Sequence, residues 1–187
     1  MSKIDDVSRE VKKLLEQYQK LVLKWNHAIN LISKNSSREF WLRHIVDSLQ
    51  LLKYIDDKNI SIIDVGSGAG LPGIVLSIAG VKEVTLIESD ERKCMFLFQA
   101  SKISPNKVKI LNKRVEDVYL ECDILTSRAF ASLDKIFSYT KNIKVKNKYL
   151  LLKGENYLQE FKSECKVHDS ITSKKGKILE CPPKLSL

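Results

Sequence analysis

Three glycines that directly follow an apolar segment could let the backbone come close to a nucleoside or phosphate ligand. Gly66, Gly68 and Gly70 come after residues 60–65, which are almost continuously apolar, as expected for a strand buried on both faces of a parallel sheet. Glycine has no Cβ, so the chain can turn tightly at these positions and approach a ligand. We therefore predict a site for an adenosine-containing cofactor at this junction.

A carboxylate follows at the end of the next apolar segment, residues 83–88. Glu88 lies where the second strand of such a unit ends, and a carboxylate there can accept hydrogen bonds from both hydroxyls of a ribose. We expect Gly66, Gly68 and Leu71 to lie along the rest of the cofactor.

The glycine spacing alone leaves alternatives open. Gly68, Gly70 and Gly73 also match the G-x-G-x-x-G pattern of NAD- and FAD-binding domains, and a glycine turn without any ligand is a further alternative. The length of 187 residues favours a single methyltransferase-type sheet with an N-terminal addition, because a dinucleotide-binding domain plus a substrate domain usually needs a longer chain.

The segments that must position these residues can be read from apolar periodicity. Apolar residues at spacings of three and four predict helices over residues 7–25 and 36–52. Beyond them, alternation of strands and helices predicts a mostly parallel, seven-stranded sheet with helices on both faces. The predicted strands are 60–65, 83–88, 108–112, 122–126, 148–152, 166–172 and 177–181, and the predicted helices are 71–79, 91–102, 132–140 and 155–163. Residues 1–55 would form a helical extension packed on a domain of residues 56–187.

Positive charge is concentrated toward the C-terminus. The chain carries a formal charge of +9, and residues 135–187 hold 12 lysines against 5 acidic residues. We expect a basic face directed at a polyanion, with Lys144, Lys146, Lys148 and Lys153 meeting phosphates. A merely solvated lysine-rich surface is the alternative. Residues 141–148 are interpreted as a short basic connector.

The cysteines and the apolar segments suggest the setting. The 4 cysteines are widely spaced without a C-x-x-C pair, so no metal site is predicted. No signal-type segment or long apolar stretch is present in the sequence. We expect a cytoplasmic protein with reduced thiols that has no membrane contact and acts as a monomer.

Several peptides together resemble the RsmG/GidB family of bacterial 16S ribosomal RNA guanine-N7 methyltransferases. These peptides are Trp25-Asn26 with Asn30-Leu31, Arg43-His44-Ile45-Val46-Asp47-Ser48, Asp64 to Gly73, Ser127 to Leu133, and Leu152-Lys153-Gly154. The resemblance implies a class I, Rossmann-like α/β fold and S-adenosylmethionine as the cofactor. It also implies methylation of N7 of a guanine in the 530 loop, with 16S ribosomal RNA or the small ribosomal subunit as the partner.

The resemblance extends the list of expected site residues. It places Val115 and Glu116 beside the adenine and adds Arg128 to the cofactor pocket. The predicted cofactor-binding residues are thus Gly66, Gly68, Gly70, Leu71, Glu88, Val115, Glu116 and Arg128. Two departures from the family pattern are Glu88 in place of the usual Asp and Pro182-Pro183, which end the last strand early.

The substrate atom can be argued partly from what is absent. After the fourth strand the chain has Ser127-Arg128-Ala129-Phe130 instead of the Asp/Asn-Pro-Pro-Tyr/Phe peptide of amine methyltransferases. Cys122 opens its strand, where it is badly placed for a cytosine-C5 nucleophile. Guanine N7 is an unprotonated lone pair, so its methylation needs placement more than a general base, and no catalytic residue is assigned.

Side chains near the ends of the predicted elements could place the substrate. Arg43, His44, Asp47 and Lys153 are the candidates, with Arg43 and Asp47 spaced to pair along one helix face. Arg128 could read guanine O6 or a phosphate, or pair with Glu116 or Asp117. Phe130 could stack on a base or belong to the core.

Two other functions remain open at this point. One is methylation of a protein or small molecule, and the other is a non-catalytic, nucleotide-responsive RNA-binding module.

Overall fold

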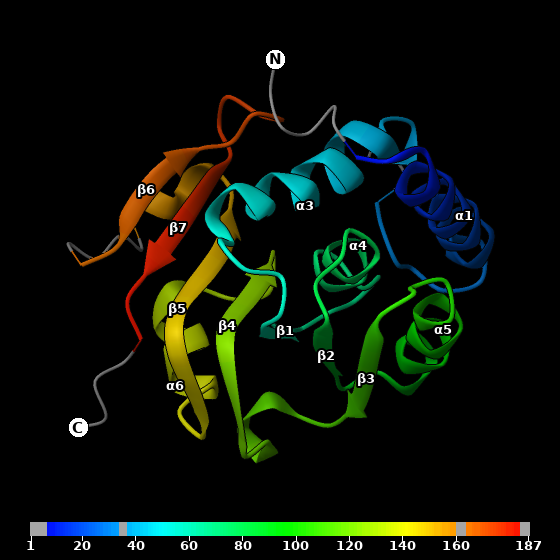
Figure 1. Ribbon diagram of the computed structural model, residues 1–187. Coiled ribbons are helices and arrows are strands. Elements are labelled where there is room, and N and C mark those ends of the chain that lie inside the picture. The colour runs from blue at the N-terminus through cyan, green and yellow to red at the C-terminus, as the bar shows by residue number, and fades with distance from the viewer. Residues whose placement is uncertain (1–6, 34–36, 160–163, 184–187) are drawn as a thin grey trace.

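A seven-stranded sheet forms the centre of the molecule (Figure 1). The computed structural model describes residues 7–33, 37–159 and 164–183. The strand order is β3-β2-β1-β4-β5-β7-β6, with β1 to β5 parallel and β7 antiparallel to both of its neighbours. The strands are β1 (Ser61–Val65), β2 (Glu83–Glu88), β3 (Lys107–Asn112), β4 (Leu120–Arg128), β5 (Ile143–Lys153), β6 (Lys166–Asp169) and β7 (Lys177–Cys181). The predicted mostly parallel sheet is confirmed.

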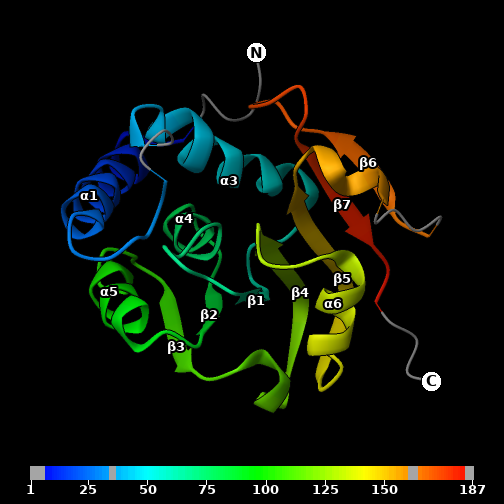
Figure 2. The ribbon, with the colours of Figure 1, turned by 180° about the vertical axis from the view of Figure 1, so that it is seen from behind.

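Helices cover both faces of this sheet, as predicted. The helical elements are α1 (Arg9–Asn26), η1 (Trp41–Val46), α3 (Asp47–Leu49), η2 (Gln50–Tyr54), α4 (Gly73–Ile78), α5 (Glu91–Ser101), η3 (Val115–Asp117), α6 (Leu133–Tyr139) and η4 (Glu155–Gln159). Alternate residues of β1 belong to two separate cores, because successive side chains of a strand point to opposite faces. Ile62 packs in the core with α1, α3, α4 and α5, whereas Ile63 packs in the core with α6. Figure 2 shows α6 beside β4 and β5, away from α1 and α5.

Helix α1 lies against the core through one apolar stripe. Leu15, Tyr18 and Val22 are buried on it, and the ring of Trp25 meets that of Phe96 on α5 with 5.8 Å between centroids. The helix begins after Ser8, whose hydroxyl accepts the N–H of Val11 at 3.3 Å. The residues near the N-terminus therefore form part of the same core as the sheet.

The second predicted helix has an irregular backbone. Residues 41–46 form a π-helix, followed by one short α-helical turn and a 3-10 helix. Residue 36, where the predicted helix begins, lies outside the described residues. Because a π-helix bonds residue i to i+5, side chains four apart no longer stack on one face.

The lysine-rich segment before residue 148 was misinterpreted from the sequence. Instead of a connector it is the first half of β5, which begins at Ile143. Ile143 and Val145 are buried while Lys144 and Lys146 are exposed, the alternation of a strand. Toward the C-terminus, the helix predicted over 155–163 is a 3-10 helix over Glu155–Gln159, with residues 160–163 outside the described part. The strand predicted over 166–172 ends at Asp169.

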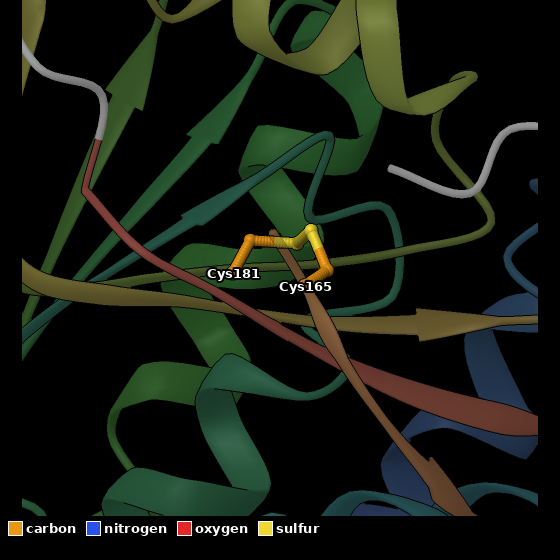
Figure 3. Close-up of a disulfide and its surroundings, with 2 residues drawn as sticks. All are labelled: Cys165 and Cys181. Atoms are coloured by element: carbon orange, nitrogen blue, oxygen red, sulfur yellow. A yellow bond between two sulfur atoms is a disulfide. The ribbon is translucent and has the colours of Figure 1, made fainter. Parts of the chain in front are cut away.

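Two of the four cysteines are joined in a disulfide (Figure 3). Cys165, directly before β6, is bonded to Cys181, the last residue of β7, with 4.2 Å between their Cα atoms. The expectation of four reduced thiols is therefore wrong for this pair, because the antiparallel register of β6 and β7 brings distant residues together. Cys94 and Cys122 are free and buried, and burial raises the pKa of the Cys122 thiol to about 12.

Within the described ranges, no cluster of three or more His, Cys, Asp or Glu side chains could hold a metal ion. None of the helices in this part of the chain has the length and apolar character needed to cross a membrane.

Candidate cofactor and substrate site

A cleft of about 1330 Å³ opens at the carboxyl ends of the parallel strands, the edge where ligands bind in open α/β sheets. It brings together eleven of the twelve sequence-predicted site residues. Those that line it are Gly66, Gly68, Leu71, Glu88, Val115, Glu116, Arg128, Arg43, His44, Asp47 and Lys153. Gly70, which we predicted to contact the cofactor, is not among the lining residues.

The glycine turn explains this difference. Gly66, Gly68 and Gly70 have φ values of +65°, +56° and +82°, a region that glycine adopts without steric cost. A Cβ on Gly70 would lie 2.6 Å from the side chain of Ile74, so this glycine allows packing against the core. A Cβ on Gly66 would lie 2.1 Å from the ring of Phe130, which covers this glycine within the cleft.

Glu88 reaches back from β2 to the glycine turn. Its side chain is 8% exposed, and its two oxygens accept the N–H groups of Gly68 and Asp90, each at 2.9 Å. An ionised carboxylate has about four acceptor positions, so both oxygens can accept a further hydrogen bond. The extra methylene relative to Asp is accommodated, and the residue fits a contact with two ribose hydroxyls.

Asp64, near the end of β1, is a buried acid beneath the turn. Its Oδ2 accepts the N–H of Gly73 at 3.0 Å, while Oδ1 has no hydrogen-bond partner among the described residues. Burial raises the pKa of this carboxyl to about 7. Residue 73 packs too closely for any side chain, because a Cβ there would lie 2.4 Å from the side chain of Leu86.

Arg128, at the end of β4, contacts Arg43 and Asp47 of the helical segment. Neither of the ion pairs predicted for this region is formed in the part of the chain that the structure describes. Nη1 of Arg128 donates to the backbone oxygen of Arg43 at 3.0 Å and lies 3.6 Å from Oδ2 of Asp47. The predicted pair of Arg43 with Asp47 is wrong, because the π-helix changes their relative directions and Arg43 lies 3.9 Å from Glu39 instead. The alternative pairing of Arg128 with Glu116 or Asp117 is also wrong.

Asp47 connects this wall of the cleft to the turn between β6 and β7. Its Oδ1 accepts hydrogen bonds from Gln50 at 2.8 Å and from the hydroxyl of Thr172 at 2.6 Å. Gln50 in turn accepts the N–H of Ile171 at 3.0 Å. Nothing in the sequence pattern indicated Gln50 or Thr172, because their partners are far away in the chain.

His44 is buried between the helical segment and the cleft. Burial, together with the positive charges of Arg128 and Arg43, lowers its pKa to about 3. The imidazole is therefore neutral at physiological pH. Its ring lies 5.0 Å from that of Phe40, and neither ring nitrogen has a hydrogen-bond partner in the described ranges.

Lys153 and Phe130 complete the opposite wall. The Lys153 ammonium donates to the backbone oxygen of Ala131 at 2.5 Å, and so supports the loop after β4. Phe130 is partly buried, packs 6.1 Å from Tyr139 and also lines the cleft. It thus belongs in part to the core, one of the two interpretations that the sequence left open, and stacking on a base stays a prediction.

Of the four lysines that we predicted to meet phosphates, Lys153 lines the cleft and the other three do not. Lys144 and Lys146 lie near the amino end of β5, away from the cleft, and contact Glu121 at 2.9 and 2.6 Å. Lys148 contacts Glu180 at 3.0 Å. The rim of the cleft instead carries three cations that form no ion pair in the described part of the chain, and sequence reasoning missed them. These are Lys93, Lys113 and Arg114.

Comparison with known proteins identifies the family. The family model described as GidB, rRNA small subunit methyltransferase G, matches residues 11–184. The chain belongs to this family. It is 58% identical to the ribosomal RNA small subunit methyltransferase G of Rickettsia rickettsii (strain Sheila Smith) over 183 residues, which is 94% of this chain and 95% of the relative. It is 56% identical to the protein of the same name from Rickettsia bellii (strain OSU 85-389) over 182 residues, which is again 94% of this chain and 95% of the relative.

Solved structures of other methyltransferases share the fold. The ribosomal protein L11 methylase of Lactobacillus delbrueckii subsp. bulgaricus aligns with a TM-score of 0.62 and 12% identity, over 76% of this chain and 79% of that one. The magnesium protoporphyrin IX methyltransferase of Synechocystis PCC 6803 aligns with a TM-score of 0.61 and 11% identity, over 87% and 98%.

These matches confirm the family that the motifs resembled and, with it, the methyltransferase class. Membership of this methyltransferase family also confirms S-adenosylmethionine as the cofactor and rejects the alternative of an NAD- or FAD-binding domain.

Proposed function

We propose that this protein transfers the methyl group of S-adenosylmethionine to N7 of a guanine in the 530 loop of 16S ribosomal RNA. One observation carries the proposal. A single cleft joins the glycine turn and Glu88 on one wall to Arg128, His44 and Asp47 on the other. It is lined by residues of the peptides that carry the resemblance to this family, and the GidB match over residues 11–184 supports both the reaction and the substrate.

The cofactor would be held by the turn and the strand ends. Gly66 and Gly68 allow close backbone approach, Glu88 accepts from the ribose, and Val115 and Glu116 border the adenine. When bound, the cofactor supplies a methyl group on a positively charged sulfur.

The residues of the opposite wall suit a substrate atom that needs no deprotonation. Guanine N7 carries a free lone pair, so the protein has to orient the base and exclude water, and orientation can supply most of the acceleration. Arg128 offers only donors, which match the acceptors O6 and phosphate. His44 is neutral, and so adds no positive charge next to the base.

The RNA has to present its guanine in an accessible form. N7 lies in the major groove, which is too deep and narrow in A-form RNA for side chains to reach. The target base must therefore lie in a loop or leave its stack. We propose that Lys93, Lys113 and Arg114 on the rim contact phosphates of that loop.

Transfer of a labelled methyl group tests the proposal. The protein is incubated with bare 16S RNA, with small subunits and with free nucleosides, and the product is located by mass analysis of nuclease fragments. We expect label at one guanine of the 530 loop in RNA or in small subunits. Label on a protein or small molecule alone, or cofactor binding with no transfer, would favour one of the two alternative functions.

The Arg128→Lys variant separates the roles of that side chain. Lysine keeps the charge but loses the fork of donors. If Arg128 reads the guanine, transfer falls while cofactor affinity stays the same; if it belongs to the cofactor pocket, cofactor affinity falls as well.

We also propose that the protein acts as a monomer in the cytoplasm and that residues 1–55 form an extension of the domain of residues 56–187. Light scattering of the purified protein, alone and with RNA, measures its mass and so tests whether it is a monomer.

A further inference from the structure

Helix α1 reaches the cofactor turn through one side chain. Tyr18 is fully buried, and its hydroxyl donates to the backbone oxygen of Ala69 at 2.5 Å, 51 residues further along the chain. Ala69 lies between Gly68 and Gly70, the two turn glycines with positive φ on either side of it.

This hydrogen bond fixes the direction of one peptide group in the turn. No other donor reaches the Ala69 oxygen within the described part of the chain. A buried carbonyl without a partner is costly, so loss of the hydroxyl favours rotation of the peptide that joins Ala69 to Gly70. Burial raises the pKa of Tyr18, so its hydroxyl remains a protonated donor.

Rotation of that peptide would be transmitted to the cofactor-binding groups. Gly68, directly before Ala69, donates its N–H to Glu88 at 2.9 Å. The orientation of Glu88 toward a ribose thus depends on the conformation of the turn.

We propose that Tyr18 positions the glycine turn for cofactor binding, so that helix α1 contributes to cofactor affinity through this contact. The proposal rests on the proposed function only through the cofactor, and it is independent of which RNA is methylated. Tyr18 acts through Ala69 and does not line the cleft, and so it is a positioning residue.

The ring of Tyr18 has a separate packing role. It lies 6.3 Å from the ring of Phe40, which in turn lies 5.0 Å from His44. A Tyr18→Phe variant keeps this packing and removes only the hydroxyl, which makes it the informative change.

Calorimetric titration of Tyr18→Phe with S-adenosylmethionine tests the proposal. Loss of one buried hydrogen bond is expected to weaken cofactor binding by about three- to tenfold. The matched control is Tyr149→Phe, which removes the hydroxyl of another buried tyrosine, one that lies near Thr140 on the face of the sheet covered by α6. Thermal unfolding of both variants records any general loss of stability, and the control is expected to keep its cofactor affinity.

Unchanged cofactor affinity in Tyr18→Phe would overturn the proposal, and so would equal weakening in both variants. In steady-state assays Tyr18→Phe should raise the KM for the cofactor while kcat at saturation is retained. A wild-type protein that binds the cofactor but does not methylate 16S RNA would refute the proposed function and leave the role of Tyr18 standing.

Discussion

The two ends of the parallel sheet carry charged side chains in opposite ways. At the carboxyl ends, Asp64 and Glu88 are buried, and the nearby cations Lys113 and Arg114 form no ion pair in the described ranges. At the amino ends, Lys144 and Lys146 share the carboxylate of Glu121, and all three side chains are exposed by 44% or more.

The difference shows how charge indicates function in this protein. Lysines gather in the last third of the sequence, but the two near the start of β5 are paired with a carboxylate of the neighbouring strand. Burial of acids and a lack of partners for cations mark the end of the sheet that can bind a ligand. Each of the following experiments changes one end and uses the other as its control.

The largest effect is expected for Gly66→Ala. The new Cβ would meet the Phe130 ring at 2.1 Å, at a φ of +65°. Strain at positive φ and overpacking together cost roughly 2 to 5 kcal/mol, so we expect cofactor affinity to fall by at least about thirtyfold in calorimetry.

The control for Gly66→Ala is Gly80→Ala at the amino end. Gly80 has a φ of +114°, and its Cβ would meet only the flexible side chain of Lys58, at 3.2 Å. This variant should lose stability and keep its cofactor affinity. Equal loss of affinity in the two variants would contradict the difference between the ends.

Glu88→Ala is expected to have the next largest effect. Hydrogen bonds to charged groups contribute about 1.5 to 3 kcal/mol each, so loss of this carboxylate should weaken cofactor binding by at least about tenfold. Glu121→Ala removes a carboxylate from the other end and should leave the affinity unchanged. A loss below tenfold for Glu88→Ala would assign the ribose to backbone groups.

The pH dependence of stability should also differ between the ends. The pKa of Asp64 is raised to about 7 in the folded protein, against about 3.9 in an unfolded chain. The buried acid therefore contributes stability below pH 4 that is lost as the pH rises through 7. Between pH 5 and 8 the wild-type protein should lose on the order of 2 kcal/mol of unfolding free energy that Asp64→Asn retains.

Glu121 provides the opposite sign. Its hydrogen bonds with Lys146 and Lys144 lower its pKa to about 2, so its contribution is present above the unfolded value and is lost as the pH falls toward 2. Urea denaturation of wild-type, Asp64→Asn and Glu121→Gln at several pH values checks both directions. Parallel pH profiles for wild-type and Asp64→Asn would show that Asp64 does not titrate as proposed.

The smallest effect concerns the salt dependence of RNA binding. Each single-strand phosphate that a cation neutralises contributes about 0.7 to the log–log slope. Replacing Lys113 and Arg114 with Gln should therefore reduce the slope by about 1.4, whereas replacing Lys144 and Lys146 with Gln should not change it. A change confined to the second pair would return the RNA contact to the lysines that the sequence first indicated.

Local sequence signals predicted the features that depend on neighbouring residues. The apolar run before Gly66 predicted β1 and the turn, and Glu88 was identified from its place at the end of β2. The first half of β5 was missed because the charge of its lysines was given more weight than their alternation with the apolar residues Ile143 and Val145.

Contacts between distant residues could not be predicted in this way. The stripe of α1 identified Tyr18 as a packing residue, but periodicity cannot show that its hydroxyl meets Ala69. Asp47 was missed as the partner of Arg128 because the two residues are far apart in the chain, and Arg43 was wrongly paired with Asp47 because α-helical spacing was assumed where the backbone is a π-helix. Cys165 and Cys181 likewise depend on the register of β6 and β7.

The bonds from Asp47 and Gln50 to the turn after β6 determine when the cleft can be completed during synthesis. The glycine turn, Glu88 and Arg128 are all made before Ile171 and Thr172, which lie 121 and 125 residues after their partners. A ribosome releases the chain from its N-terminus onward, so a nascent protein can assemble its cofactor half while the wall beside Arg128 still lacks these contacts. The turn after β6, which is translated later, therefore completes a site whose other parts were made much earlier.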